Sequence, residues 1–323
     1  MTRRPRSFTD RVNWKAKEYR AFLLFYSLPC LEDLLPKPNF ANLKLFVNAV
    51  HILLSDNISP RLLSQAKSDL HNFAVGFQRL YGLETVSYNL HMCSHLADLV
   101  QKAGPLWSYS NFVFESGNGF LLNFIKGTKS IIHEIAVKFS TVRTALKLIL
   151  SYDISQKALK FCRDILIYPY TKSHLEVGDV DLTSQSIISV TDQESELLEA
   201  SNVSVSNNKV VYYPRAIRSR IVHCSKSYSK TKVYDDSCVL LSNGTYATID
   251  KIVKSNMDEL LCVIRPIQTA EESGIIKSVK KCAHNFYGTV CVVPFNNIVR
   301  KCMLVTFEDK GFVCHIPNLY ERD

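Results

Sequence analysis

The stretch "DSCVLLSNGTYATIDKIVK" (236–254) decides the fold class of the C-terminal part of this 323-residue chain. Apolar and polar residues alternate on both sides of Asn243 and Gly244, and an Asn-Gly pair favours the tight turn of a β-hairpin. Similar short runs extend from "KVVYYPRAI" (209–217) to "KGFVCHIPN" (310–318). Several short strands at this spacing predict a small β-barrel or β-sandwich domain over residues 209–323.

The segment before these strands has a different composition. Its sequence, "GDVDLTSQSIISVTDQESELLEASNVSVSNN" (178–208), is acidic and rich in Ser, and it shows little periodicity. Polar segments of this kind commonly connect folded parts without burying a face of their own. Residues 171–208 are therefore predicted to be an acidic, Ser-rich linker.

Residues 13–170 are predicted to form a mainly helical domain, preceded by a basic N-terminal arm over residues 1–12. Apolar residues recur at helical spacing through several segments, and Ser59 followed by Pro60 is a typical helix start. Gly82 and Gly104 are expected to end helices, and Pro29 to end or kink the first one. Helices followed by strands make the predicted fold class α+β.

The charge of the chain is uneven. The net charge is +9, and residues 1–170 hold 21 Lys and Arg against 12 Asp and Glu, whereas residues 171–323 hold 18 of each. An excess of this kind suits an anionic partner, with DNA the first candidate, although solvated side chains on helix faces would give the same count. Basic residues lie close to the aromatic residues Trp14 and Tyr19, and the candidate DNA contacts are Arg3, Arg4, Arg6, Arg11, Lys15 and Lys17.

Membrane and secretory signals are not found in the sequence. No run of about 20 apolar residues is present, and the basic N-terminus is not followed by the apolar segment of a signal peptide. We therefore expect a nuclear or cytoplasmic protein that is not secreted and does not enter a membrane. The ten Cys are scattered singly, which is typical of reduced, buried thiols and not of a zinc finger.

The segment "NLHMCSHL" (89–96) holds the densest group of metal-ligand residue types. His91 and His95 are four residues apart, so a helix places them on the same face, with Cys93 between them in sequence. This spacing suits two ligands of a zinc ion, but zinc takes three or four. A hydrogen-bonded His pair without a metal is the alternative.

The segment "GPLWSYSNFVFESGNGF" (104–120) places one carboxylate, Glu115, among aromatic residues. We expect an extended run to reach Phe114 and a helix to begin near Ser116, so that Glu115 lies beside a helix N-terminus, which favours its charged form. Glu115 is then either a catalytic acid or a helix-capping residue packed among aromatics. One acid alone cannot carry out general acid–base or two-metal chemistry.

The order of several segments is more specific than any one of them. The stretches "RPRSFTDRVNWKAKEYRAFLLFYSLPCLEDLL", "AVHILLSDNIS" and "LYGLETVSYNLHMCSHLADLVQKAGPLWSYSNFVFESGNG" follow one another over about residues 3–130. This succession resembles the C-terminal portion of CACTA-type (En/Spm) transposases, including the animal versions that carry a β-rich tail. The residues of the matching motifs include Trp14, Gly104, Pro105, Trp107, Phe112, Phe114 and Asn118.

The resemblance implies an RNase H-like catalytic core, of which the helical region here would be a remnant. Such transposases are expected to use two Asp and one Glu to hold two Mg²⁺ or Mn²⁺ ions. Glu115 matches the position of the late acid, while Met1 falls just before the first shared motif, so the upstream Asp pair has no counterpart. The acids that precede Glu115 occur in helical or capping contexts, not on strands; they are Asp10, Asp33, Asp56, Asp69 and Asp98.

Two functions follow as expectations. The first is a transposable-element-derived protein that is catalytically incomplete, needs no metal cofactor and retains DNA binding through its basic N-terminal half. The second is a protein-interaction module that uses an exposed edge of the β-rich C-terminal domain and has no DNA-binding or catalytic role.

Overall fold

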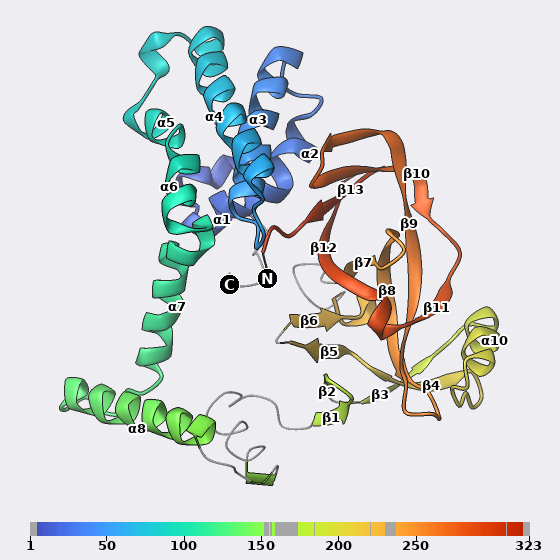
Figure 1. Cartoon of the computed structure of the whole chain (residues 1–323). Helices are drawn as coiled ribbons and strands as arrows, with labels where there is room; N and C mark the ends of the chain where they lie inside the picture. The colour runs from blue at the N-terminus through green and yellow to red at the C-terminus, as the bar shows by residue number, and fades with distance from the viewer. Residues whose placement is uncertain are drawn as a thin grey trace. The chain divides into compact units, whose positions relative to one another are not determined.

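The computed structural model describes residues 5–151, 155, 157–158, 174–183, 185–219, 221–229, 237–307 and 309–318. The chain forms two compact units, one made of Met1–Ser108 with Leu175–Asp323 and the other of Tyr109–His174. Helices occupy the N-terminal part, and antiparallel strands occupy the C-terminal part (Figure 1). The α+β class predicted from the sequence is therefore confirmed.

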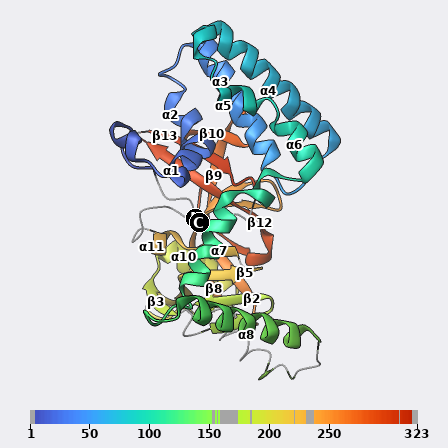
Figure 2. The same ribbon diagram turned by 90° about the vertical axis from the view of Figure 1, so that its left-hand side faces the viewer.

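The helices of the first unit begin and end at the predicted local signals. The Ser59 hydroxyl accepts a hydrogen bond from the Leu62 amide at the start of α4, and Gly82 and Gly104 end α4 and α6 with φ of 92° and 89°. Long α3 and α4 lie side by side (Figure 2). The helices are α1 (Ala16–Ala21), α2 (Ser27–Leu31), α3 (Lys37–Leu53), α4 (Pro60–Tyr81), α5 (Tyr88–Cys93) and α6 (Leu96–Ala103), with short 3₁₀ turns at Phe8–Asn13, Leu83–Thr85 and Leu106–Tyr109.

Pro29 does not end the first helical run; it lies inside α2, directly after a π-helical segment, Phe22–Tyr26. Proline has no amide hydrogen, so the carbonyl four residues earlier loses its usual donor. That carbonyl, of Phe25, accepts from the Cys314 thiol at 3.6 Å, and the neighbouring carbonyl of Leu24 accepts from His51 Nε2 at 3.0 Å. Side chains from other elements therefore satisfy the backbone of the interrupted helix.

Six strands of the C-terminal part pair in a closed ring, in the order β8, β9, β10, β13, β12 and β7, and back to β8. The predicted hairpin is present as β7 and β8, and Gly244 in its turn has φ of 84°. β11 extends the sheet beside β9, and β4 and β3 extend it beside β8. The ring strands are β7 (Cys238–Leu241), β8 (Tyr246–Lys254), β9 (Leu260–Ile276), β10 (Val279–Tyr287), β12 (Ile298–Phe307) and β13 (Lys310–His315); the others in this sheet are β3 (Ser186–Ser189), β4 (Lys209–Tyr213) and β11 (Cys291–Pro294).

Successive side chains of a strand point to opposite faces, and both faces of the ring strands carry buried apolar residues. One cluster of buried side chains is shared by the strands of the ring: Cys238, Ile267, Cys282, Cys302, Leu304 and Val313. The opposite faces of the same strands pack outward. There a four-stranded sheet contributes to a second cluster, and its strands are β1 (His174–Val177), β2 (Val180–Thr183), β5 (Arg215–Arg218) and β6 (Ile221–Cys224).

The helices of the first unit share a hydrophobic core with the ring. Leu24, Phe25 and Leu28 belong to the same buried cluster as Met303 of β12 and Phe312 of β13. Ion pairs join the residues that follow α2 to the ring, because Glu32 pairs with Lys281 of β10 and Asp33 with Lys310 of β13. The structure thus divides the chain differently from the predicted domains 13–170 and 209–323, since residues 16–54 fold against the strands.

The predicted linker, residues 171–208, contains β1, β2, β3 and helix α10 (Asp192–Ala200). Thr191 caps α10, and Leu198 is buried in a cluster with Val210, Val253 and Leu261. The segment is folded, contrary to the prediction, because its apolar partners lie on strands far along the chain. Its own composition gives no sign of them.

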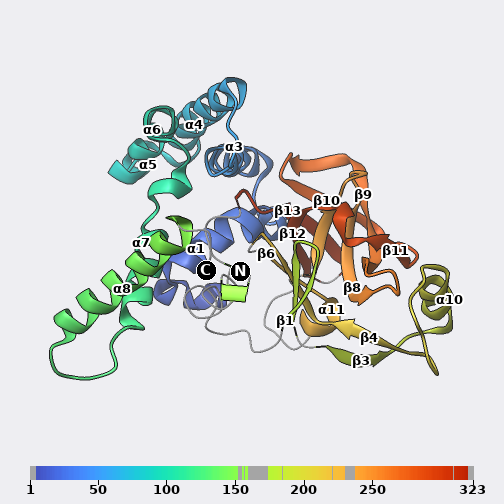
Figure 3. The ribbon, with the colours of Figure 1, turned by 60° about the horizontal axis from the view of Figure 1, so that its bottom comes forward.

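The second unit contains α7 (Asn111–Leu122) and α8 (Ile131–Ser151), which follow one another along the chain (Figure 3). Ser110 caps α7 by accepting a hydrogen bond from the Phe112 amide. Glu134 near the start of α8 accepts hydrogen bonds from the Lys126 amide and pairs with Lys138. The end of the predicted helical region, from residue 152 to 170, lies mostly outside the described residues.

Candidate functional site

The N-terminal arm is folded onto α1 from Pro5 onward. Arg6 pairs through two nitrogens with the Glu18 carboxylate, at 2.8 and 2.9 Å, and its Nη1 lies 3.2 Å from Asp10. Hydrogen bonds from the Arg6 side chain and then from the Lys15 amide lower the pKa of Glu18 to about 2. Because its guanidinium is already paired with two carboxylates, Arg6 is a structural residue here and a poor phosphate contact.

The other candidate DNA contacts have varied surroundings. Arg11 lies over the Phe8 ring at 5.2 Å, and its backbone carbonyl accepts a hydrogen bond from the Tyr19 hydroxyl. Lys15 is exposed just before α1, and Lys17 is half-buried. Arg3 and Arg4 lie outside the described residues. The arm therefore supplies few exposed, unpaired cations in the part that the structure describes.

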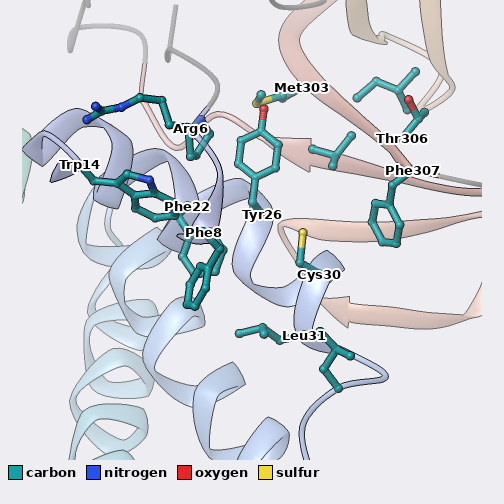
Figure 4. Close-up of a pocket in the computed structure, with 14 residues that line it drawn as sticks. Arg6, Phe8, Trp14, Phe22, Tyr26, Cys30, Leu31, Met303, Thr306 and Phe307 are labelled. Atoms are coloured by element: carbon teal, nitrogen blue, oxygen red, sulfur yellow. The ribbon is translucent and has the colours of Figure 1, made fainter. Parts of the chain in front are cut away.

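An apolar pocket of about 550 Å³ lies between the arm, α2 and β12 (Figure 4). Trp14 is buried at one side of it, and the indole donates to the Ser7 carbonyl. The lining is mainly aromatic and aliphatic: Phe8, Phe22, Tyr26, Leu31, Met303 and Phe307. Among the described lining residues only Arg6 is charged, and it is paired, so this lining suits an apolar group and contains no acid–base pair.

His91 and His95 are brought together as the spacing predicts, although the helix breaks between them. His91 belongs to α5, His95 precedes α6, and their Nε2 atoms are 3.3 Å apart. Two nitrogen ligands of a tetrahedral zinc ion would be roughly 3.3 Å apart, so this geometry suits either a zinc ion or one shared hydrogen bond. Among the described residues, no group of three or more His, Cys, Asp or Glu is placed to hold a metal.

Glu115 lies within α7, which begins at Asn111, and not at the predicted junction between an extended run and a helix. Its side chain is exposed. Phe114 beside it is 63% exposed, so it does not form a wall around the carboxylate. The helix begins five residues before the predicted start near Ser116, and Ser110 caps it.

The remaining motif residues divide between the two units. Gly104 and Pro105 follow α6, and Trp107 packs beside the core shared by the helices and the ring. Phe112 and Asn118 belong to α7. The segment 104–120 thus forms a helix end, a turn and the start of the second unit, and does not form a single catalytic loop.

Sequence reasoning missed the exposed cations of the second unit. Residues 109–151 hold five Lys and Arg against two Glu, a net charge of +3. On α8, helical spacing aligns an exposed set that we call the basic face: His133, Ser140, Arg143, Thr144 and Lys147. The i, i+4 spacing of Arg143 and Lys147 is the sequence signal for this face, and the cations near the N-terminus are denser.

Comparison with known proteins gives no relative: no family model, curated protein or solved structure matches the chain. Within the described residues, no helix has both the length and the apolar character needed to cross a membrane.

Proposed function

We propose that this chain is a transposable-element-derived protein that binds nucleic acid through helix α8 and does not cut it. The origin is supported by the ordered motifs, from "RPRSFTDRVNWKAKEYR" to "GPLWSYSNFVFESGNG", that resemble the C-terminal portion of CACTA-type transposases. In such a protein the helical region would be a remnant of the RNase H-like core. The binding role rests on the basic face of α8.

The proposal gives no catalytic role to Glu115. A two-metal site needs several carboxylates around the same ions. Glu115 is exposed on α7, and Asp10, Asp33 and Asp98 each pair with a basic side chain. Asp69 accepts hydrogen bonds from the side-chain amides of two residues, Asn48 and Gln65. These acids serve contacts within the fold.

The basic face of α8 has the chemistry that a phosphate backbone requires. Arg143 and Lys147 are exposed, and neither side chain forms a hydrogen bond or ion pair with another described residue. The hydroxyls of Ser140 and Thr144 lie on the same side of the helix and can donate to phosphate oxygens. From His133 to Lys147 the face extends for roughly 20 Å at about 1.5 Å per residue.

A salt-dependent binding assay tests this proposal. Fluorescence anisotropy would follow the full chain binding a labelled duplex of about 20 base pairs over a range of salt concentrations. The variant Arg143→Gln/Lys147→Gln should bind more weakly, and its salt slope should be smaller by about 1.8. Arg61→Gln/Arg79→Gln on α4 removes the same charge from another exposed helix and is the matched control. Equal slopes for the two variants would refute the role of α8.

A second candidate function, peptide binding at a sheet edge, is favoured by strand β3. β3 is the last strand of its sheet, and its outer edge is not paired with any strand of the described chain. Ile187 is 71% exposed and stands opposite the exposed Val211 on β4. An extended peptide could add a strand there. Peptide selection on the intact chain, with Ile187→Pro as control, would identify such binding.

A further inference from the structure

A second cavity, of about 540 Å³, lies in the first unit between helices α3 and α4 and the sheet. The helices contribute Lys44, Asn48 and His51 to its lining, and the sheet side contributes Arg300 and His315. Cavities that bind small molecules commonly have this size and carry a few convergent polar groups. Its lining is different from that of the apolar pocket, and no residue of α8 belongs to it.

One wall of the cavity is already hydrogen-bonded. The Asp69 carboxylate accepts from Asn48 Nδ2 and from Gln65 Nε2, both at 2.7 Å. Each carboxylate oxygen therefore has a donor. This wall gives the cavity a fixed polar side and joins α3 to α4.

Two other polar groups of the lining, one from α3 and one from the sheet side, have no hydrogen-bond partner among the described residues. His51 is only 4% exposed, and its Nε2 faces the Leu24 carbonyl at 3.0 Å. Since a carbonyl only accepts, Nε2 must carry the hydrogen, and Nδ1 is left as a bare acceptor. Both that Nδ1 and the Ser278 hydroxyl oxygen are buried without a hydrogen-bond partner in the described structure.

Positive charge is supplied by side chains that line the same cavity. The Arg300 guanidinium is half-buried and forms no hydrogen bond or ion pair with another described residue. Lys44 and Lys277 also line the cavity. His315 bonds through Nε2 to the Tyr246 hydroxyl at 2.7 Å, and burial lowers the pKa of both His51 and His315 to about 4. The histidines are therefore neutral, and the cationic character comes from Arg300 and the lysines.

We propose that this cavity binds a small phosphorylated molecule that also carries a free hydroxyl group. The phosphate would accept hydrogen bonds from Arg300 and from Ser278, and the hydroxyl would donate to His51 Nδ1. Buried polar groups are costly when they remain unpaired, and such a ligand would satisfy both of them. The proposal is independent of nucleic-acid binding through α8, because it uses none of the same residues.

Isothermal titration calorimetry of the full chain tests the proposal with four probes: ribose 5-phosphate, a nucleoside 5′-monophosphate, inorganic phosphate and ribose. The two phosphate esters should bind, inorganic phosphate should bind more weakly because it does not extend to both sides of the cavity, and neutral ribose should not bind. Failure of both phosphate esters to bind, or equal binding of ribose, would overturn the assignment.

Variants then locate the binding. Arg300→Gln removes the charge and should weaken ribose 5-phosphate binding about tenfold or more. Ser278→Ala removes one hydroxyl at the β9–β10 turn and is expected to leave the fold intact, so it keeps the test valid if Arg300→Gln unfolds. Arg79→Gln, an exposed charge near the end of α4 and outside the cavity, is the matched control. Unchanged affinity in Ser278→Ala and Arg300→Gln would contradict the proposed site.

Discussion

Replacing Phe25 by Ala tests whether the N-terminal helices and the strand ring unfold as one structure. Phe25 is 2% exposed and belongs to the buried cluster that contains Phe312 and Cys314 of β13. Its ring also meets the His51 ring edge-on at 6.4 Å between centroids. The substitution therefore leaves a cavity between helix and sheet.

The expected cost can be estimated from the size of the lost side chain. Buried Phe→Ala substitutions cost about 3–5 kcal/mol of unfolding free energy. Domains are typically stable by about 5–15 kcal/mol, so this loss is a large share of the total. Phe139→Ala on α8 is the matched control, because Phe139 is an exposed residue of the second unit. We expect the control to change the unfolding free energy of the first unit by about 0.5 kcal/mol or less.

Urea unfolding should be followed with two probes. Far-UV circular dichroism reports mainly the helices, and labelling of the buried thiols of Cys262 and Cys302, located by mass spectrometry, reports the strands. Both midpoints should move together to lower urea in Phe25→Ala. If the strand thiols kept their original midpoint while the helical signal was lost, the shared core would be refuted, and the separate domains predicted from the sequence would be favoured.

Three further predictions concern charge and metal. Burial lowers the pKa of His223 to about 3 and of His51 and His315 to about 4. Below about pH 6.5 the unfolded chain therefore binds more protons than the folded chain, and the urea midpoint of unfolding should fall as the pH drops towards 4. A midpoint that rose on acidification would contradict this. Lys251→Met leaves the buried Glu194 carboxylate without its ion-pair partner and should lower the free energy of unfolding by about 3–5 kcal/mol, as measured with urea. The double variant Lys251→Met/Glu194→Leu should recover part of this loss. An unchanged midpoint in Lys251→Met would show that the ion pair does not contribute to stability. In a competition assay with a chelating dye, Zn²⁺ should bind weakly through His91 and His95, and His91→Gln should abolish the binding. Equal zinc affinity of the unmodified chain and of His91→Gln would exclude these two histidines as zinc ligands.

Features of the fold that depend on neighbouring residues could be predicted from the sequence. The Asn243–Gly244 turn, the Ser59 cap and the helix ends at Gly82 and Gly104 each follow from backbone preferences over a few residues. The alternating runs from residue 209 onward likewise indicated strands and a barrel.

Features that depend on distant contacts could not be predicted. Phe25 and Cys314 are in contact although they are 289 residues apart, and the sequence near either residue does not indicate the other. Leu198 lies in a polar segment and is buried only because strands later in the chain cover it. The continuation of the helix through Pro29 has the same cause, since its uncompensated carbonyl is satisfied by that distant thiol.

In the candidate site, too, features set by neighbouring residues could be predicted and features set by distant contacts could not. The i, i+4 spacing correctly brought His91 and His95 together, because Ser94 and His95 keep right-handed helical backbone angles across the break between α5 and α6. The exposure of Glu115 and the pairing of Arg6 with Glu18 depend on how the chain folds around them, and motif matching does not contain that information. The basic face of α8 was visible in the spacing of Arg143 and Lys147, but its exposure was not.

The salt dependence of duplex binding by the full chain decides whether α8 recognises nucleic acid. Log affinity should fall linearly with log salt concentration. Arg143→Gln/Lys147→Gln should lower the slope by about 1.8, while Arg61→Gln/Arg79→Gln should leave it closer to that of the unmodified chain. No binding at low salt, or the same loss of slope in both variants, would contradict nucleic-acid recognition by α8.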